Sequence, residues 1–264
     1  RLRARGIDAV AEYASARDRH PGGAGTLAVG VSASGSTPET VEALARHRAA
    51  GGAVAAVTND PGSALAADAD VVVDLAAGRE EGGVACRTFR HTLAALLALE
   101  AQLVGAPRDG VPDAVRRAAD ATDDLLARRD AWLADAVGLL AATDRSFAIA
   151  PAERISSAEQ AALMLREGPR LAAHACETGD WLHVDVYLTK PLDYRALLFV
   201  GSRFDAEVMR WVGERRATVV AVAGDVAGAR ASIRFPGDDR EEVALLAEVV
   251  VPELVAAEVW EARP

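Results

Sequence analysis

Short apolar runs alternate with longer helical patterns along this chain, and this alternation limits its possible folds more than any other feature. The runs occupy residues 26–31, 53–58, 71–75, 146–150, 196–201, 218–223 and 232–235. Strands of a parallel sheet are buried on both faces and need crossover helices between them, so they read as continuous apolar runs of this length. The sequence therefore predicts an α/β fold of doubly wound parallel sheets.

The helical patterns divide the chain into two halves. They cover approximately residues 1–19, 37–50, 84–104, 113–142, 157–166, 205–215 and 241–260. The pattern over 113–142 is charged and amphipathic, and it separates the strands of the first half from those of the second. We predict a first domain at 1–106, a linking helix within 107–143 and a second domain at 144–264.

An internal repeat supports this division. Residues 26–60 read as strand, Gly/Ser turn, helix, strand and acidic turn, and residues 196–225 repeat that order. The second copy keeps Ser202 but has Arg203-Phe204-Asp205 where the first copy has a cluster of hydroxyls. Because an aspartate in that turn would repel an anion, only the first copy is expected to bind one.

The turn after the first apolar run reads Ser-Ala-Ser-Gly-Ser-Thr, and Pro38 then begins a helix. A loop rich in hydroxyls and free N–H groups beside the positive end of a helix favours an anion, above all a phosphate. In doubly wound sheets ligands bind at the carboxyl ends of the strands, where this loop lies. The predicted phosphate-binding residues are Ser32, Ser34, Gly35, Ser36 and Thr37.

A solvated turn and a nucleotide site are the two other interpretations of this loop. The hydroxyls can equally belong to a solvated turn, with Thr37 capping the following helix in either case. The loop contains no lysine, so it does not fit a Walker-type nucleotide site.

Composition and charge exclude some classes of partner. The formal net charge is −10, which argues against nucleic acid, and no apolar run reaches the ~20 residues that a membrane helix requires. The two cysteines cannot form a disulfide framework, so a reducing cytoplasm is the expected location. A metal site is not expected, because Asp180, His183 and Asp185 fit no common ligand spacing.

Four stretches resemble a known family. SASGST, NDPGSALAADADVVVDL and EGGVACRTFRHTLAALLAL resemble the first half of a tandem sugar isomerase (SIS) protein, and MLREGPRLAAHACETGDWLHV resembles the second. The chain is similar to the isomerase half of glucosamine-6-phosphate synthase and to stand-alone amino-sugar-phosphate isomerases and deaminases. The resemblance implies two tandem flavodoxin-like subdomains, with the family's first strand falling before Arg1.

The resemblance also implies a reaction and its residues. Ser32, Ser34 and Thr37 would hold the phosphate of a hexose 6-phosphate. Glu167 would move a proton between C1 and C2, and His183 would assist opening of the sugar ring. The residues expected near the sugar are Glu81, Val84 and Ala85. The family's histidine reaches into the neighbouring subunit, so a homodimer with shared sites is implied, and no metal or organic cofactor is required.

The chain departs from the family pattern in ways that leave a second interpretation open. The family's His-Gly-Pro is here His183-Val184-Asp185, and no lysine stands near the C-terminus. From the residues alone, Glu167 can be an exposed carboxylate paired with Arg166 or Arg170, and His183 a structural residue in a strand-like run. The leading function is a sugar-phosphate isomerase or deaminase; the alternative is a non-catalytic sugar-phosphate-binding protein.

Overall fold

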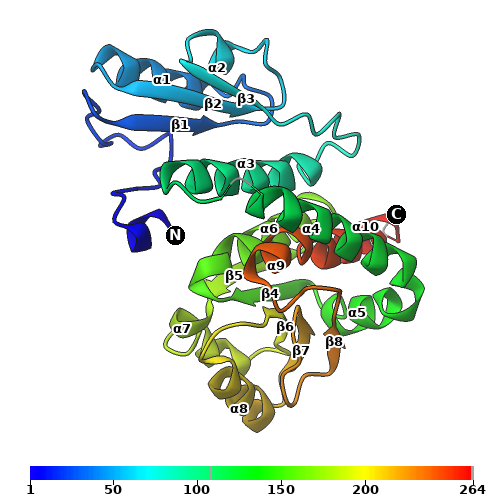
Figure 1. Ribbon diagram of the computed structural model, residues 1–264. Helices are drawn as coiled ribbons and strands as arrows, with labels where there is room; N and C mark the ends of the chain where they lie inside the picture. The colour runs from blue at the N-terminus through cyan, green and yellow to red at the C-terminus, as the bar shows by residue number, and fades with distance from the viewer. Residues whose placement is uncertain (108, 263–264) are drawn as a thin grey trace. The chain divides into compact units, whose positions relative to one another are not determined.

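The computed structural model describes residues 1–107 and 109–262. The chain forms two compact units, Arg1–Val111 and Pro112–Pro264, each built on a parallel sheet (Figure 1). The predicted α/β class with parallel sheets is confirmed.

The first unit contains a three-stranded sheet in the order β1-β2-β3. Helices cover both of its faces, as Figure 1 shows, with α1 and α2 on one face and α3 on the other. Leu44 of α1 packs with Val54 and Leu65, whereas Ala95 of α3 packs with the cluster around Val57 on the opposite face. The elements are β1 (Leu27–Val31), α1 (Pro38–Ala49), β2 (Ala53–Thr58), α2 (Ala64–Ala67), β3 (Val71–Asp74) and α3 (Arg87–Leu103), after a 3-10 turn at Leu2–Arg5.

The second unit contains a five-stranded parallel sheet in the order β5-β4-β6-β7-β8. This is the strand order of flavodoxin-like doubly wound sheets. In such sheets strands are first added on one side of the first strand, and from the third strand onward on its other side. The strands are β4 (Arg145–Ala150), β5 (Ala172–Glu177), β6 (Arg195–Phe199), β7 (Thr218–Val222) and β8 (Ala231–Ile233). The helices of this part of the chain are α4 (Gly110–Ala127), α5 (Leu133–Leu140), α6 (Ile155–Glu167), α7 (Thr178–Trp181), α8 (Asp205–Arg215), α9 (Glu241–Ala247) and α10 (Val250–Glu261), with 3-10 turns at Arg129–Ala131, Ala152–Arg154 and Asp185–Thr189.

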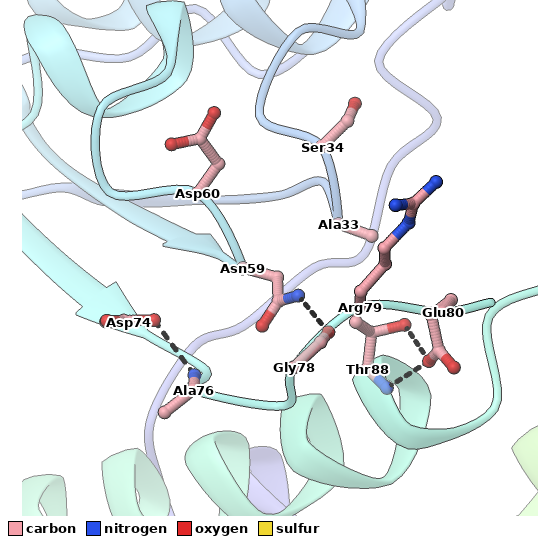
Figure 2. Close-up of a pocket in the computed structure, with 10 residues that line it drawn as sticks. All are labelled: Ala33, Ser34, Asn59, Asp60, Asp74, Ala76, Gly78, Arg79, Glu80 and Thr88. Atoms are coloured by element: carbon pink, nitrogen blue, oxygen red, sulfur yellow. Dashed lines mark hydrogen bonds between the residues drawn. The ribbon is translucent and has the colours of Figure 1, made fainter.

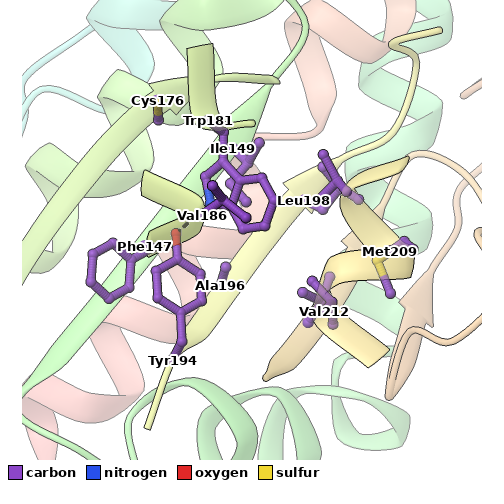
Figure 3. Close-up of a cluster of buried hydrophobic side chains, with 12 residues drawn as sticks. Phe147, Ile149, Cys176, Trp181, Val186, Tyr194, Ala196, Leu198, Met209 and Val212 are labelled. Atoms are coloured by element: carbon purple, nitrogen blue, oxygen red, sulfur yellow. Dashed lines mark hydrogen bonds between the residues drawn. The ribbon is translucent and has the colours of Figure 1, made fainter. Parts of the chain in front are cut away.

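An aromatic cluster fixes the segment that follows β5 (Figure 3). The rings of Phe147 and Tyr194 stack with their centroids 4.1 Å apart, and the buried Trp181 indole donates a hydrogen bond of 2.8 Å to the Tyr194 hydroxyl. Burial raises the pKa of Tyr194 far above its usual range, so this hydroxyl stays protonated. The cluster therefore anchors α7 and the 3-10 turn after it to the sheet.

Three predicted helices differ in the structure. The helix expected over 1–19 is wrong: only Leu2–Arg5 is helical, and it ends at Gly6, which adopts a left-handed conformation with φ of 77°. The side chains of Val10 and Tyr13 are 70% and 85% exposed. An amphipathic pattern does not form a stable helix unless its apolar face finds a surface to pack on.

The helix expected over 113–142 is broken into α4, a 3-10 turn and α5. The break lies at Trp132, whose buried indole turns back to donate to the Leu125 carbonyl at 3.2 Å. The helix expected over 241–260 is likewise two helices. A continuous helix would need the N–H of residue 252 to donate to the Glu248 carbonyl, and proline has no N–H. The chain therefore begins a new helix, α10, with Pro252 in its first turn.

The crevice where the second sheet changes winding direction is filled by the chain's own charged groups. Arg154 donates to the carboxylate of Glu248 and to the Val200 carbonyl. The side chains of Arg154 and Glu248 are buried. Burial raises the pKa of Glu248 to about 7, although the Arg154 guanidinium opposes the rise. The Asp205 carboxylate accepts hydrogen bonds from the N–H groups of Gly201 and Ser202 at 2.7 and 3.0 Å. The turn that repeats the phosphate loop is thus occupied by an internal carboxylate.

The buried ion pair generates a stability prediction. Glu248→Ala should lower the free energy of unfolding by about 3–5 kcal/mol, because it leaves the buried Arg154 guanidinium without a counter-charge. The double variant Arg154→Met with Glu248→Leu should recover much of that loss, since it removes both charges together. Urea denaturation of the wild type, of Arg154→Met and Glu248→Leu as single variants and of the double variant measures this, and a loss in the double variant equal to the sum of the two single losses would contradict it.

Candidate functional site

An open cavity of about 800 Å³ lies at the carboxyl ends of the first unit's strands (Figure 2). It is bounded by the turns that follow β1, β2 and β3 and by the start of α3. Its lining residues are Ala33, Ser34, Asn59, Asp60, Asp74, Ala76, Gly78, Arg79, Glu80 and Thr88. Ligands of parallel α/β sheets bind at this edge, so the cavity is the candidate site of the first unit.

The phosphate loop, residues 32–37, forms one wall of this site. Its hydroxyls pair with one another: Ser32 Oγ lies 2.8 Å from Thr37 Oγ1, and Ser34 Oγ lies 2.8 Å from Ser36 Oγ. Within the described part of the chain, the N–H groups of Ser34, Thr37 and Glu39 have no acceptor. These donors surround the N-terminus of α1, where the helix dipole favours negative charge.

Thr37 precedes α1 as predicted, but its side chain does not cap the helix. The Thr37 carbonyl accepts from the N–H groups of Thr40 and Val41, while its hydroxyl pairs with Ser32. The expected capping bond is therefore wrong in detail, because the Ser32 hydroxyl is the nearer partner. In the first turn of α1, as the structure describes it, the Glu39 N–H is left without an acceptor.

Gly35 allows the loop to lie close against the turn after β2. Its φ of +61° is a conformation that favours glycine. A Cβ atom at this position would lie only 1.9 Å from Ser63 Oγ and 2.8 Å from Thr58 Oγ1. The Gly35 carbonyl also accepts a hydrogen bond of 2.9 Å from the N–H of Leu65, so the loop is fixed from below by residues of β2 and α2.

The opposite wall of the cavity is the β3–α3 loop, residues 75–86. Asn59 holds it at two points: its amide nitrogen donates to the Gly78 carbonyl at 2.7 Å, and its amide oxygen accepts from the Ala77 N–H at 2.8 Å. Figure 2 shows the Asn59 side chain directed at this loop. The Asn59 side chain thus bonds to the backbone of the β3–α3 loop in the way that a neighbouring strand would, beyond the end of β2.

Glu80 caps α3 from this loop. Its carboxylate accepts from the N–H and hydroxyl of Thr88 at 2.7 and 2.9 Å and from the Cys86 N–H at 3.0 Å. Partial burial acts to raise the pKa of Glu80, but these hydrogen bonds and the Arg87 guanidinium outweigh it and lower the pKa. Glu80 therefore stays ionised and uses its charge on the helix N-terminus.

The charges around the cavity are mixed. Asp60, Asp74 and Glu80 supply carboxylates, and Arg79 supplies a guanidinium, the one cation among the described lining residues. The Asp74 carboxylate accepts from the Ala76 N–H at 2.8 Å. An anionic ligand would therefore need to place its charge at the phosphate loop and direct hydroxyl donors toward the carboxylates.

Of the predicted phosphate-binding residues, Ser34 lines the cavity, whereas Ser32, Gly35, Ser36 and Thr37 are not among its described lining residues. Glu81, Val84 and Ala85 lie on the same β3–α3 loop, where Glu81 is exposed and the other two are half-buried. None of these three lines the cavity within the described residues, and all of these roles remain predictions. The sequence signal for Asn59 was its position directly after the second apolar run, whereas Glu80 lies in the polar loop that follows the third run.

The two predicted catalytic residues belong to the second unit. Glu167 is the last residue of α6 and its side chain is exposed. His183 is also exposed, and the strand-like setting predicted for it is wrong, because it lies in a turn after α7 with its N–H bonded to the Asp180 carbonyl at 3.0 Å. The partner of Asp185 is His174, whose Nε2 lies 3.4 Å from the carboxylate.

Two further features bear on possible ligands and surroundings. In residues 1–107 and 109–262, no group of three or more His, Cys, Asp or Glu side chains is arranged to hold a metal ion. The same residues contain no helix with the length and apolar character needed to span a membrane.

Comparison with known proteins identifies the first unit. The SIS domain model matches residues 7–101. A glutamine–fructose-6-phosphate aminotransferase (isomerizing) from Aeropyrum pernix is 35% identical over 181 residues, which is 63% of this chain and 28% of that protein. An N-acetylmuramic acid 6-phosphate etherase from Symbiobacterium thermophilum is 54% identical over 56 residues, 21% of this chain and 19% of that protein. The chain thus spans less than a third of the length of either relative.

A solved structure extends the likeness to both units. The C-terminal domain of a glucosamine-fructose-6-phosphate aminotransferase from Francisella tularensis superposes with a TM-score of 0.79 at 15% identity, covering 98% of this chain and 78% of that one. At this identity the match establishes the fold alone. The SIS domain model thus matches most of the first unit, and the chain is similar to part of an isomerizing glutamine–fructose-6-phosphate aminotransferase.

Proposed function

We propose that the first-unit cavity binds a hexose 6-phosphate, with the phosphate held by the phosphate loop. One observation carries this proposal: within the described residues, the hydroxyl-rich loop before α1 has N–H groups with no acceptor, and Ala33 and Ser34 of that loop line the cavity. A phosphate dianion can accept from these N–H groups and from the one hydroxyl hydrogen that each hydroxyl pair leaves over, and charge-assisted hydrogen bonds of this kind are the strong ones.

The names of the relatives support the ligand class more than they support a reaction. One is named for fructose 6-phosphate and the other for N-acetylmuramic acid 6-phosphate, and their named reactions differ. What the two names share is a sugar phosphorylated at position 6. A loop that binds the phosphate and leaves the sugar to other residues is compatible with several reactions of sugar 6-phosphates.

For the reaction, we propose isomerisation of an aldose–ketose or amino-sugar phosphate, or the related deamination. Glu167 would take a proton from one of the carbons C1 and C2 and return it to the other, through a cis-enediol or enediolamine. His183 would donate and accept protons at the ring oxygen and C1 hydroxyl during ring opening. The substrate carbonyl acidifies the C–H bond, so a positioned carboxylate is sufficient as base.

These catalytic roles rest on the family resemblance. The resemblance also supports the proposal that the second unit is a further SIS domain, and that two copies of the chain pair so that His183 serves the neighbouring subunit. Consistent with a division of labour, the second unit's equivalent turn already holds the Asp205 carboxylate and has no room for a second anion.

A second candidate function is non-catalytic binding of the same ligand. Val184 directly after His183 is exposed, but the next two residues, Asp185 and Val186, are buried, and Val186 packs in the aromatic cluster. This replaces the Gly-Pro that follows the family's histidine. A chain that keeps the phosphate loop and uses this segment for packing would bind the sugar phosphate without turning it over.

The ligand proposal predicts a loss of affinity in a loop variant. Ser34→Ala combined with Thr37→Val should weaken binding of fructose 6-phosphate by roughly 100-fold, because two hydrogen bonds to a charged group are removed. Isothermal titration calorimetry measures this change. Ser202→Ala alters the matching turn of the second unit and is the control, with no expected effect. Equal affinity of the double variant and the wild type would refute the proposal.

The reaction proposal predicts proton exchange that depends on Glu167. In D₂O, the wild type should incorporate deuterium at C2 of glucosamine 6-phosphate or at C1 of fructose 6-phosphate. Glu167→Gln should slow exchange by about 10²–10⁴-fold while leaving affinity unchanged, because it removes the base and not the phosphate grip. Glu159→Gln, an exposed carboxylate on the same helix, is the matched control. Binding without exchange in the wild type would favour the second candidate.

A further inference from the structure

The two residues at the end of β2 face different walls of the cavity. Thr58 is completely buried, and its hydroxyl lies against the phosphate loop. Asn59 follows it, and its amide is directed at the β3–α3 loop (Figure 2). Successive residues of an extended chain point in opposite directions, so one strand end can support two walls at once.

Thr58 connects the phosphate loop with the floor of the cavity. Its hydroxyl donates to the Ala33 carbonyl at 3.3 Å and accepts from the Asp60 N–H at 3.2 Å. Ala33 directly precedes Ser34, and Thr58 Oγ1 also faces the side of Gly35 that a Cβ atom would occupy. The position of the loop donors therefore depends on the Thr58 side chain.

Asn59 acts on the sugar side of the cavity. Its two side-chain hydrogen bonds fix Ala77 and Gly78, and these residues lead directly to Arg79 and Glu80 of the lining. The backbone N–H of Asn59 donates to the Ala33 carbonyl at 3.0 Å, and this bond does not need the side chain. Loss of the Asn59 side chain would thus release the β3–α3 loop and leave the phosphate loop tied to β2.

We propose that Thr58 and Asn59 are positioning residues with separate tasks, Thr58 setting the geometry for the phosphate and Asn59 setting the geometry for the sugar. This inference rests on the proposed binding of a hexose 6-phosphate. The hydroxyl bond of Thr58 to Ala33 and the two amide bonds of Asn59 end on different walls, so their effects on ligand affinity separate.

The test compares two ligands across matched variants. Isothermal titration calorimetry measures affinity for inorganic phosphate, which engages the phosphate loop alone, and for fructose 6-phosphate, which engages both walls. Thr58→Val keeps the shape of the side chain and should weaken both ligands by a similar factor of about tenfold. Thr58→Ser restores the hydroxyl and should return both affinities to within about twofold of the wild type.

Asn59→Ala should leave the affinity for inorganic phosphate within about twofold of the wild type and weaken fructose 6-phosphate about tenfold. Val54→Ala is the control for a general loss of stability, because Val54 is a buried residue of the same strand away from both walls. It should lower the melting temperature and change neither affinity. Circular dichroism and thermal unfolding confirm that each variant is folded at the temperature of titration.

Three outcomes would overturn the inference. If Asn59→Ala weakens both ligands equally, the residue has no separate task. If Thr58→Val changes neither affinity, or Thr58→Ser fails to restore it, the hydroxyl does not position the loop. If the wild type binds neither ligand, the proposed function itself fails and this inference falls with it.

Discussion

The site of the first unit depends on hydrogen-bond donors that the fold leaves unpaired at one edge of a parallel sheet. At the carboxyl end of β1 the chain leaves the sheet and enters α1 through a loop of small residues, and the N–H groups of Ser34, Thr37 and Glu39 there have no acceptor within the described chain. Ser34 and Glu39 are exposed and Thr37 is half-buried, so these donors are open to an acceptor from outside the chain. The phosphate of a ligand would be such an acceptor.

The two units satisfy the same constraint in different ways. In the second unit the donors after β6 are Gly201 and Ser202, and the Asp205 carboxylate of the same chain accepts from them. Arg154 and Glu248 fill the neighbouring crevice with a buried ion pair. In the first unit short hydroxyls occupy the corresponding turn and bond to one another and to N–H groups of the same turn. In the second unit the turn is therefore occupied by a carboxylate of the chain itself, whereas in the first unit the turn can accept an anion from outside the chain.

Most strands of the described chain could be predicted because their signals are local. Each apolar run became a strand of a parallel sheet, and the hydroxyl-rich loop lies where the first run ends. Strand β5 was missed, because its residues do not form a continuous apolar run. The helix expected over 1–19 failed because its apolar side chains, such as Val10 and Tyr13, stay exposed. The helix expected over 113–142 is interrupted where Trp132 donates back to Leu125, and the one expected over 241–260 is divided before α10, which carries Pro252 in its first turn.

The sequence by itself determined the α/β class and the place of a hydroxyl-rich turn between a strand and a helix, because apolar runs, glycine and a helix start are local signals. Tertiary structure decided which residues form the opposite wall. Glu81 was the expected sugar contact, yet Glu80 lines the cavity, since its carboxylate caps α3 through Thr88. Asn59 reaches Gly78 across the sheet edge. Such contacts depend on how neighbouring strands end side by side, and no local pattern in the chain records that.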